Sequence, residues 1–369
     1  MLKKVGILGA GKVGRAMALD LANSFKVTSA DISSQALASL KSSNSDILTE
    51  QLDLSKPESL ERFIPNHDII LNAVPGYMGY SVSKQVLEAK RNLVDISFMP
   101  EDFMQLDSLA KKNSVTAVMD AGIAPGVSHL LAGFANSKMK LENLVIYVGG
   151  LPKVRTWPFN YKAPYSLCDV LEEYTRPVTI RENGSTQVVE ALSGLELIES
   201  ETELGTLEAF YTDGLRSLLE TMPHVSTMKE KTLRYPGHTE YINVLKQSGF
   251  LSQSTLELGG KEFRPIDLTT KVLEKSFDLK EGEEDFLVMI FKAWGGGKSM
   301  TGRVFDKYRE GVSAMGRTTG YTATACTNLV AKSFSEKGVF PLDLLGANQE
   351  HYDFLVDYLK QRNIQINWD

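Results

Sequence analysis

Cysteine is scarce in this sequence, and its scarcity excludes whole classes of site. Only Cys168 and Cys326 occur among the 369 residues, and they lie far apart in the chain. A disulfide framework is therefore excluded, a cysteine-based zinc site is not expected, and a reducing compartment fits best. The five histidines form no closely spaced pair, so the sequence predicts no metal centre.

Long hydrophobic runs are also missing. No apolar stretch reaches the ~18 residues that a membrane-spanning helix needs. The apolar stretch that follows Lys4 is interrupted by Lys12 and Arg15, so it does not make a signal peptide. We therefore expect a cytoplasmic protein.

An excess of positive charge is absent as well. Lys and Arg number 40 against 46 Asp and Glu, which gives a net charge of -6 at pH 7. Such a chain has no general attraction for nucleic acid or anionic membranes, so we expect a small-molecule substrate as its partner. The hydrophobic fraction of 43% and the length are typical of a soluble protein with two domains.

The chain up to residue 120 alternates between short apolar runs and segments of helical periodicity. Strands are predicted at 5–8, 25–30, 68–74, 92–96 and 115–120, and helices at 14–22, 33–40, 56–63, 81–90 and 106–112. This alternation is typical of an α/β fold with a doubly wound parallel sheet of the Rossmann type.

After Ala121 the pattern changes to a turn-rich and β-prone stretch. Strands at 286–294 and 301–308 are joined by Gly295-Gly296-Gly297-Lys298, which predicts a hairpin. Helices are predicted at 229–232, 239–248, 265–275, 318–334 and 351–361.

Gly9-Ala10-Gly11-Lys12-Val13-Gly14 is a GxGxxG motif between a predicted strand and a predicted helix. Its first glycine permits a tight turn, its second lets a pyrophosphate approach the backbone, and its third lets helix and strand pack closely. Asp31 lies 20 residues beyond Gly11, where a carboxylate accepts hydrogen bonds from a ribose 2′-hydroxyl and repels a 2′-phosphate. The motif therefore predicts NAD rather than NADP; the alternative is a glycine-rich turn that binds nothing.

The ends of the remaining strands complete the predicted cofactor site, because ligands bind at the carboxyl ends of parallel strands. Asp53, in Gln51-Leu52-Asp53-Leu54, falls where a strand between the helices at 33–40 and 56–63 should end. There it either caps the adenine side of the cofactor site or only caps the next helix. The predicted cofactor-binding residues are Gly9, Ala10, Gly11, Lys12, Val13, Gly14, Asp31, Ile32, Asp53, Leu54, Asn72, Ala73, Val74, Pro75, Ser97 and Gly122.

Several further segments carry a resemblance to a known family. They are 120–129 (DAGIAPGVSH), 149–152 (GGLP), 173–177 (EYTRP), 207–215 (LEAFYTDGL), 232–238 (TLRYPGH) and 315–321 (MGRTTGY). Over nearly its whole length the chain resembles the saccharopine dehydrogenase-like reductases, and segments 173–177 and 207–215 point to the L-lysine 6-dehydrogenase branch. Related saccharopine-forming reductases tend to carry an acidic residue where this chain has Ala124, which weighs against saccharopine as the substrate.

The resemblance implies NAD-dependent oxidative deamination of the ε-amine of L-lysine. The product is the 6-semialdehyde, which cyclises to a piperideine carboxylate, and ammonia is released. The fold implied is a Rossmann domain of residues 1–122 and about 315–369, interrupted by a mixed α/β substrate and dimerisation domain of residues 123–314. Because wide β-rich domains often pair across a two-fold axis, we also expect a homodimer.

This chemistry needs a base and groups that hold an amino acid. Asp120, His129 and His238 are the candidate catalytic residues, and a structural hydrogen-bonding role is the alternative for each. The α-carboxylate of the substrate favours a bidentate arginine. The candidate substrate-binding residues are Asp95, Arg176, Tyr211, Asp213, Arg234, Arg317, Thr318 and Tyr321, and ordinary salt bridges are the alternative for the arginines. His67, His224 and His351 are expected at the surface.

Two other functions compete with this hypothesis. One is a reductase that condenses an aldehyde with an amine, as saccharopine or carboxyspermidine relatives do; the other is a non-catalytic sensor that binds NAD. A pocket with three or more arginines would favour saccharopine, whereas one arginine with acidic groups would favour lysine or a polyamine.

Overall fold

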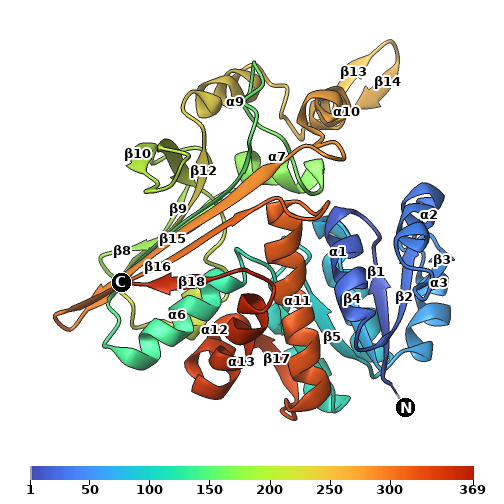
Figure 1. Cartoon of the computed structure of the whole chain (residues 1–369). Coiled ribbons are helices and arrows are strands. Elements are labelled where there is room, and N and C mark those ends of the chain that lie inside the picture. The colour runs from blue at the N-terminus through green and yellow to red at the C-terminus, as the bar shows by residue number, and fades with distance from the viewer. Residues whose placement is uncertain (1) are drawn as a thin grey trace. The chain divides into compact units, whose positions relative to one another are not determined.

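The structure is a computed structural model that describes residues 2–369, and the chain divides into two compact units (Figure 1). The first unit comprises 1–140, 216–221 and 315–366, and the second comprises 141–215, 222–314 and 367–369. The first unit thus runs past residue 122 to Lys140, and it also takes in a short segment, 216–221, from the middle of the second unit's sequence.

The first unit is built on a seven-stranded sheet in the order β17-β6-β5-β4-β1-β2-β3. All of its neighbouring strands run parallel, which confirms the doubly wound α/β fold. Its strands are β1 (Lys4–Leu8), β2 (Lys26–Asp31), β3 (Leu48–Gln51), β4 (Ile69–Asn72), β5 (Asn92–Asp95), β6 (Thr116–Met119) and β17 (Gly338–Pro341).

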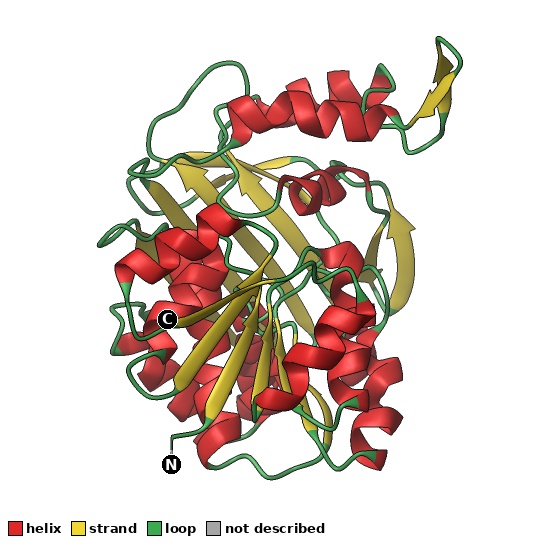
Figure 2. Ribbon diagram, turned by 90° about the vertical axis from the view of Figure 1, so that its right-hand side faces the viewer, coloured by secondary structure: helices red, strands yellow, loops and turns green. Residues whose placement is uncertain are grey.

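Helices lie on both sides of this sheet, as Figure 2 shows. They are α1 (Lys12–Leu21), α2 (Ser34–Ser43), α3 (Pro57–Phe63), α4 (Gly76–Glu88), α5 (Asp107–Lys112), α6 (Val127–Lys138), α8 (Leu218–Thr221), α11 (Ala314–Lys332), α12 (Leu342–Ala347) and α13 (Gln349–Lys360), with 3₁₀ turns at Ile64–Asn66 and Phe103–Leu106. Apolar side chains of α3, α4 and α5 share one buried cluster with the strands. A Cβ added at Gly320 of α11 would lie 3.4 Å from Ala16 Cβ of α1, so these two helices pack closely.

The second unit contains a mixed sheet of nine strands with the main order β10-β11-β12-β7-β15-β16-β18. Its strands are β7 (Asn143–Pro152), β8 (Val178–Glu182), β9 (Ser185–Val189), β10 (Glu196–Glu199), β11 (Thr206–Tyr211), β12 (Thr227–Arg234), β15 (Asp285–Gly295), β16 (Lys298–Lys307) and β18 (Ile366–Trp368). The hairpin predicted around residues 295–298 is confirmed as β15 and β16. Helices α7 (Leu167–Thr175), α9 (His238–Gln247) and α10 (Pro265–Phe277), and a small ribbon of β13 (Leu256–Leu258) and β14 (Lys261–Phe263), complete the unit.

The helix predicted at residues 229–232 is wrong. These residues lie in β12, which pairs with β7 on one side and with β11 on the other. The run of charged residues imitates a helix, but Lys229 and Lys231 point to one side of the strand and each contacts a carboxylate, Glu182 and Glu196 respectively. Ion pairs that form only after folding therefore place charged residues in a central strand.

No helix within residues 2–369 is both long enough and apolar enough to cross a membrane.

Candidate functional site

The turn between β1 and α1 has the form that a pyrophosphate requires. Gly9 adopts φ +112, and a Cβ there would lie 2.7 Å from the carbonyl oxygen of Ala73. A Cβ on Gly14 would lie 2.1 Å from the carbonyl oxygen of Gly9, whereas a Cβ on Gly11 would meet nothing within 4 Å. The outer glycines thus permit close packing, and Gly11 leaves the start of α1 open to a ligand. Because no side chain caps this helix, its first amides suit an anion.

Asp31 ends β2 beside this turn. One carboxylate oxygen accepts a hydrogen bond from the amide of Ala10 at 2.6 Å, and the other accepts one from the amide of Ser33 at 2.8 Å. The carboxylate is partly exposed, and Ile32 beside it is 64% exposed. The geometry therefore fits the ribose of a dinucleotide bound at Gly11.

Asp53 and Leu54 have local structural contacts. Asp53 accepts hydrogen bonds from the amide and the hydroxyl of Ser55 at 3.1 and 2.6 Å, and these bonds lower the pKa of its carboxyl group. The geometry favours a turn-forming role before α3, although Lys56 is the residue at the cap position itself. Leu54 is 8% exposed and belongs to the core.

Asn72, Asp95 and Ser97 form a buried network at the carboxyl ends of β4 and β5. Asp95 is completely buried, and its carboxylate accepts hydrogen bonds from Asn72, Ser83 and Ser97. Burial raises the pKa of this carboxyl group to about 6, against the lowering effect of the hydrogen bonds. A group enclosed in this way does not face a substrate, so the network favours a structural role for Asp95.

Asp120 follows β6 and pairs with an arginine that the sequence analysis did not select. Arg216 Nε donates to Asp120 Oδ2 at 2.6 Å, and Arg216 Nη1 donates to the carbonyl of Met99 at 2.8 Å. The guanidinium also lies 5.4 Å from the ring centre of Phe98. The exposed fractions of the two charged side chains are 2% for Asp120 and 7% for Arg216, so the pair is strong and little screened.

Arg216 directly follows segment 207–215, one of the segments that carry the family resemblance. This position next to the segment is the one local feature of the sequence that could have indicated a role for Arg216. Gly122, two residues beyond Asp120, is packed against Gly126, because a Cβ on Gly126 would lie 1.8 Å from the carbonyl oxygen of Gly122.

His129 is completely buried in α6, and its Nδ1 lies 3.1 Å from the hydroxyl of Ser128. This position favours the structural alternative for His129. The prediction that His67 lies at the surface is wrong: it is 4% exposed, and its Nδ1 lies 3.0 Å from the carbonyl oxygen of Phe63.

His238 begins α9 in the second unit, and both of its ring nitrogens are engaged. Nδ1 donates a hydrogen bond to the carbonyl oxygen of Phe159 at 2.8 Å. Nε2 is therefore the acceptor, and it accepts a hydrogen bond from the hydroxyl of Tyr174 at 2.9 Å. Burial and then the charge of Arg234 lower the pKa of His238 to about 3. A neutral ring with no open nitrogen is a poor general base, which favours the structural alternative.

Arg234 is 2% exposed and is enclosed by its own unit. Its Nη2 donates to Glu173 at 2.7 Å, and its guanidinium lies 4.2 Å from the ring centre of Tyr161. Two other candidate residues of this unit are close to each other: Arg176 Nη1 lies 3.9 Å from Asp213 Oδ2. Tyr211 packs against Gly194, where a Cβ would lie 2.2 Å from its ring, and Lys231 lies 4.6 Å from its ring centre.

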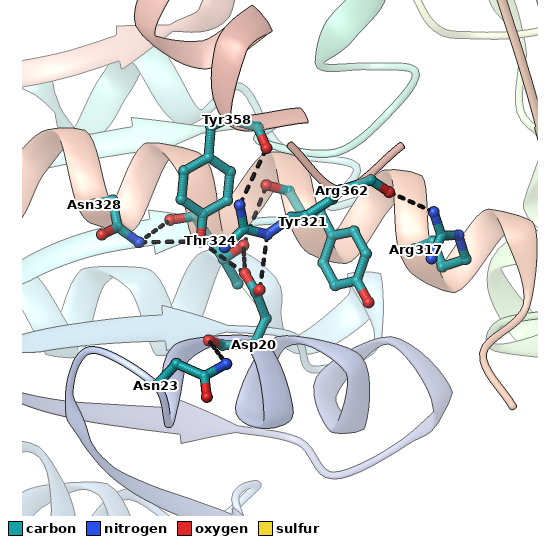
Figure 3. Close-up of polar contacts among 8 residues, drawn as sticks. All are labelled: Asp20, Asn23, Arg317, Tyr321, Thr324, Asn328, Tyr358 and Arg362. Carbon is teal, nitrogen blue, oxygen red and sulfur yellow. Dashed lines mark hydrogen bonds and ion pairs between the residues drawn. The ribbon is translucent and has the colours of Figure 1, made fainter. Parts of the chain in front are cut away.

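Arg317 and Tyr321 belong to a cluster that fastens the C-terminal segment to α1 (Figure 3). At its centre Asp20 of α1 accepts hydrogen bonds from Thr324 at 2.5 Å, Tyr358 at 2.7 Å and Arg362 at 2.7 Å. Arg317 is 4% exposed and donates to the carbonyl of Arg362 at 2.7 Å, and its guanidinium lies 5.4 Å from the ring centre of Tyr321. Thr318 is completely buried and donates to the carbonyl of Met315 at 3.3 Å. These contacts favour a structural role for all three predicted substrate residues.

The phosphate turn, Asp31, the 72–75 segment and Ser97 therefore lie at the carboxyl edge of the first unit's sheet, whereas Leu54 lies in the core. Asp120 also follows a strand at this edge, where it pairs with Arg216. No cluster of three or more potential metal ligands occurs in the part of the chain that the structure describes. The candidate site is the phosphate turn, Asp31 and the charge pair of Asp120 and Arg216.

Comparison with known proteins assigns the family. Residues 5–118 match the family described as the Saccharopine dehydrogenase NADP binding domain, and residues 122–364 match the Saccharopine dehydrogenase C-terminal domain. The chain belongs to the saccharopine dehydrogenase family. A nicotinamide dinucleotide is the class of cofactor that the first of these domains is described as binding.

The relatives of known function are distant members of this family. The saccharopine dehydrogenase (NADP(+), L-glutamate-forming) of Pyricularia oryzae is 26% identical over 303 residues, which cover 78% of this chain and 66% of the relative. The mitochondrial alpha-aminoadipic semialdehyde synthase of Rattus norvegicus is 25% identical over 72% of this chain, but the match spans only 30% of that protein. The apo saccharopine dehydrogenase (L-Glu forming) of Saccharomyces cerevisiae has the same fold, with a TM-score of 0.78, 20% identity and coverage of 100% of this chain and 99% of that one.

The Asp20 cluster generates a prediction about stability. Arg362→Gln removes the cation that faces a carboxylate whose side chain is only 10% exposed, so we expect the free energy of unfolding to fall by about 1–3 kcal/mol. Lys360→Gln, an exposed cation at the end of α13, is the matched control and should change it little. Urea denaturation measures both. A loss of equal size in the two variants would contradict the role of Asp20, whereas Asp20→Asn should recover part of the Arg362→Gln loss.

The buried His238 predicts a pH dependence of stability. Its folded pKa of about 3 lies below its ordinary value of 6.5, so the unfolded chain binds the proton more tightly. Stability should therefore be lost as the pH falls below the ordinary value, by at most ~1.4 kcal/mol per pH unit from this site. Urea denaturation at several pH values should show a shallower dependence in His238→Gln, while the exposed control His224→Gln should keep the wild-type slope. Equal slopes in all three proteins would show that His238 titrates normally.

Proposed function

We propose that this protein is an NAD-dependent dehydrogenase that deaminates the ε-amine of L-lysine. Oxidation of the ε-carbon gives an iminium, water adds to it, ammonia leaves, and the resulting 6-semialdehyde cyclises to piperideine-6-carboxylate. The bound nicotinamide would accept the hydride that leaves the ε-carbon. Family membership supports the class of reaction, and the arrangement of arginines supports the choice of substrate.

The observation that carries this choice is the state of the candidate arginines. Arg234 contacts Glu173, and Arg317 contacts the carbonyl of Arg362. Arg176 lies against Glu172 and Asp213. At the edge of the first unit's sheet Arg216 pairs with Asp120, with Arg216 Nε 2.6 Å from Asp120 Oδ2. One arginine with an acidic group suits a substrate with one carboxylate and an amine better than it suits saccharopine, which carries additional carboxylates.

In this proposal Arg216 binds the α-carboxylate of lysine, and Asp120 accepts a hydrogen bond from an amine of the same substrate. An ion pair of this kind is complementary to a zwitterion. The carboxylate of the substrate would take the place of Asp120 beside Arg216, and the ammonium group of the substrate would take the place of Arg216 beside Asp120. The reacting amine has to be neutral, so alkaline pH should favour turnover. Neither buried histidine is needed as the base.

We propose NAD rather than NADP as the cofactor, although the family domain and the fungal relatives are named for NADP. The carboxylate of Asp31 stands beside the phosphate turn, hydrogen-bonded to the amide of Ala10. No arginine follows between residues 32 and 36, so the chain offers no local cation for a 2′-phosphate there.

A reductase that condenses an aldehyde with an amine is the second candidate. The names of the curated relatives favour it, since two of them are called L-glutamate-forming saccharopine dehydrogenases. We also propose a cytoplasmic homodimer. Leu195 and Leu197, exposed by 57% and 65% beside and on the outermost strand β10, support association through the second unit.

The activity is tested by absorbance of the reduced nicotinamide with purified protein, NAD and L-lysine at alkaline pH. We expect reduction of NAD with lysine, and loss of most of it in Asp120→Asn, by about tenfold or more, because one charged contact to the substrate is removed. Consumption of NADH with an aldehyde and an amino acid, but silence with lysine, would move the protein to the condensing reductases. Binding of NADH without turnover of any amine would favour a sensor.

Cofactor preference is tested by the affinities for NADH and NADPH. Asp31→Ser should weaken the affinity for NADH by roughly five- to tenfold, because a charged hydrogen-bond acceptor for the ribose is lost. The same change should reduce the ratio of the affinity for NADH to the affinity for NADPH. Asp53→Ser removes a carboxylate at the end of the neighbouring strand and should leave both affinities unchanged. An unchanged preference in Asp31→Ser would refute the ribose role.

A further inference from the structure

Asp95, at the end of β5, is a buried carboxylate whose hydrogen-bond partners within residues 2–369 are all uncharged. Its exposed fraction is 0%, and its carboxylate accepts hydrogen bonds at four points. Oδ2 accepts from Asn72 Nδ2 and from Ser83 Oγ, each at 2.6 Å. Oδ1 accepts from the amide of Ser97 at 2.7 Å and from its hydroxyl at 2.6 Å.

The donors come from the elements that surround one turn of the chain. Asn72 is the last residue of β4, Ser83 lies in α4, and Ser97 lies in the loop after β5. The turn that connects β4 to α4 is Ala73-Val74-Pro75. A single carboxylate therefore bonds the residue before this turn, the helix that follows the turn and the loop after β5.

The turn lies directly against the phosphate turn. A Cβ on Gly9 would be 2.7 Å from the carbonyl oxygen of Ala73, and the amide of Ala73 donates to the carbonyl of Leu8 at 2.9 Å. The loop after β5 is equally close to α4, because a Cβ on Gly79 would be 2.1 Å from Ser97 Oγ. The residue that follows Asn72 is thus packed against Gly9, and Ser97 is packed against the helix that follows the turn.

We infer that the ionised carboxylate of Asp95 is a positioning residue for the dinucleotide: it holds the 73–75 turn against Gly9, so that the phosphate turn keeps its binding form. The inference rests on the proposed function, since it assumes that a dinucleotide binds at Gly11. This role differs from the substrate-binding role that the sequence suggests for Asp95, because the carboxylate acts on the 73–75 turn and not on the substrate.

A carboxylate suits this position better than an amide of the same shape. An ionised carboxylate accepts at all four lone-pair directions, whereas an asparagine would turn an NH₂ group toward one pair of donors. The main-chain amide of Ser97 and Asn72 Nδ2 can only donate, so an amide at residue 95 leaves at least one of them facing another donor. Burial of a charge without a countercharge disfavours folding, which indicates that the charge is kept for a purpose other than stability.

The same group should make dinucleotide binding sensitive to pH. The contacts of the Asp95 carboxylate on β4, α4 and the loop after β5 are uncharged, and Asp120 beyond the adjacent strand β6 is paired with Arg216. Burial raises the pKa of Asp95 to about 6, so the folded protein takes up a proton here in mild acid. The protonated carboxyl group is a weaker acceptor for the amide of Ser97 and for Asn72 Nδ2, so the turn is held less firmly.

The test is the affinity for NADH, with acid-stable ADP-ribose as a second ligand, from about pH 8 down to about pH 5. The variant is Asp95→Asn, and Asp343→Asn is the matched control. Asp343 is also a buried carboxyl group beyond a strand of this sheet, and burial raises its pKa too, but it hydrogen-bonds Ser217 rather than the residues around the 73–75 turn.

We expect Asp95→Asn to bind NADH roughly tenfold more weakly at neutral pH, as lost charged hydrogen bonds imply, with a flat pH profile. The wild type and Asp343→Asn should bind tightly at neutral pH and lose affinity as the pH falls through the pKa of Asp95. If Asp95→Asn does not fold, Ser83→Ala is the second variant. It removes one hydrogen bond from the same carboxylate and should weaken the affinity for NADH by about two- to fivefold.

Three results would overturn the inference: wild-type affinity in folded Asp95→Asn, wild-type affinity in Ser83→Ala where Asp95→Asn does not fold, or equal losses in Asp95→Asn and Asp343→Asn. Failure of the proposed function looks different, because then the wild-type protein itself binds neither NADH nor NADPH. A thermal unfolding temperature measured for each variant separates a general loss of stability from a loss confined to the dinucleotide.

Discussion

Carboxylates gather at the carboxyl edge of the parallel sheet, and the fold of the first unit depends on how each is neutralised. Asp31, Asp95, Asp120 and Asp343 stand at or just beyond the ends of β2, β5, β6 and β17. Unscreened, such charges repel one another. Each has its own donors instead: main-chain amides at Asp31, uncharged side chains and an amide at Asp95, Arg216 at Asp120 and Ser217 at Asp343. These bonds tie the loops at this edge to the strand ends.

The same carboxyl group has different properties in these different surroundings, and this separates the roles that the edge can support. A partly exposed acid beside the phosphate turn can meet a ribose, as proposed for Asp31. An acid paired with a guanidinium suits a charged substrate, as proposed for Asp120. An acid enclosed by uncharged donors can only hold its neighbours, which is the basis of the inference for Asp95. Environment, rather than residue type, therefore divides binding from positioning here.

Sequence reasoning predicted those features that depend on neighbours along the chain. Apolar runs predict the parallel sheet, and glycine spacing predicts the form of the turn at residues 9–14. Gly9 meets the backbone of the neighbouring strand end and Gly14 meets the backbone of Gly9, whereas Gly11 is left open. Features that depend on distant contacts were not predicted. Residues 229–232 form a strand because Glu182 and Glu196 receive their lysines, and Arg216 matters because the chain returns it to Asp120. No local pattern contains such pairings, so the sequence predicts a helix at residues 229–232 and does not single out Arg216.

The segments that carry the family resemblance include much of the interior of the protein. Arg234 and His238 lie in one of these segments, and both are enclosed by Glu173, Tyr174 and Tyr161. A buried guanidinium is tolerable only when a carboxylate and aromatic faces surround it, and a buried neutral imidazole only when both nitrogens have partners. A motif of this kind is constrained by packing, so its presence indicates the fold more directly than the substrate. In the proposed function, the choice between lysine and a larger amino acid is therefore assigned to the pair of Asp120 and Arg216.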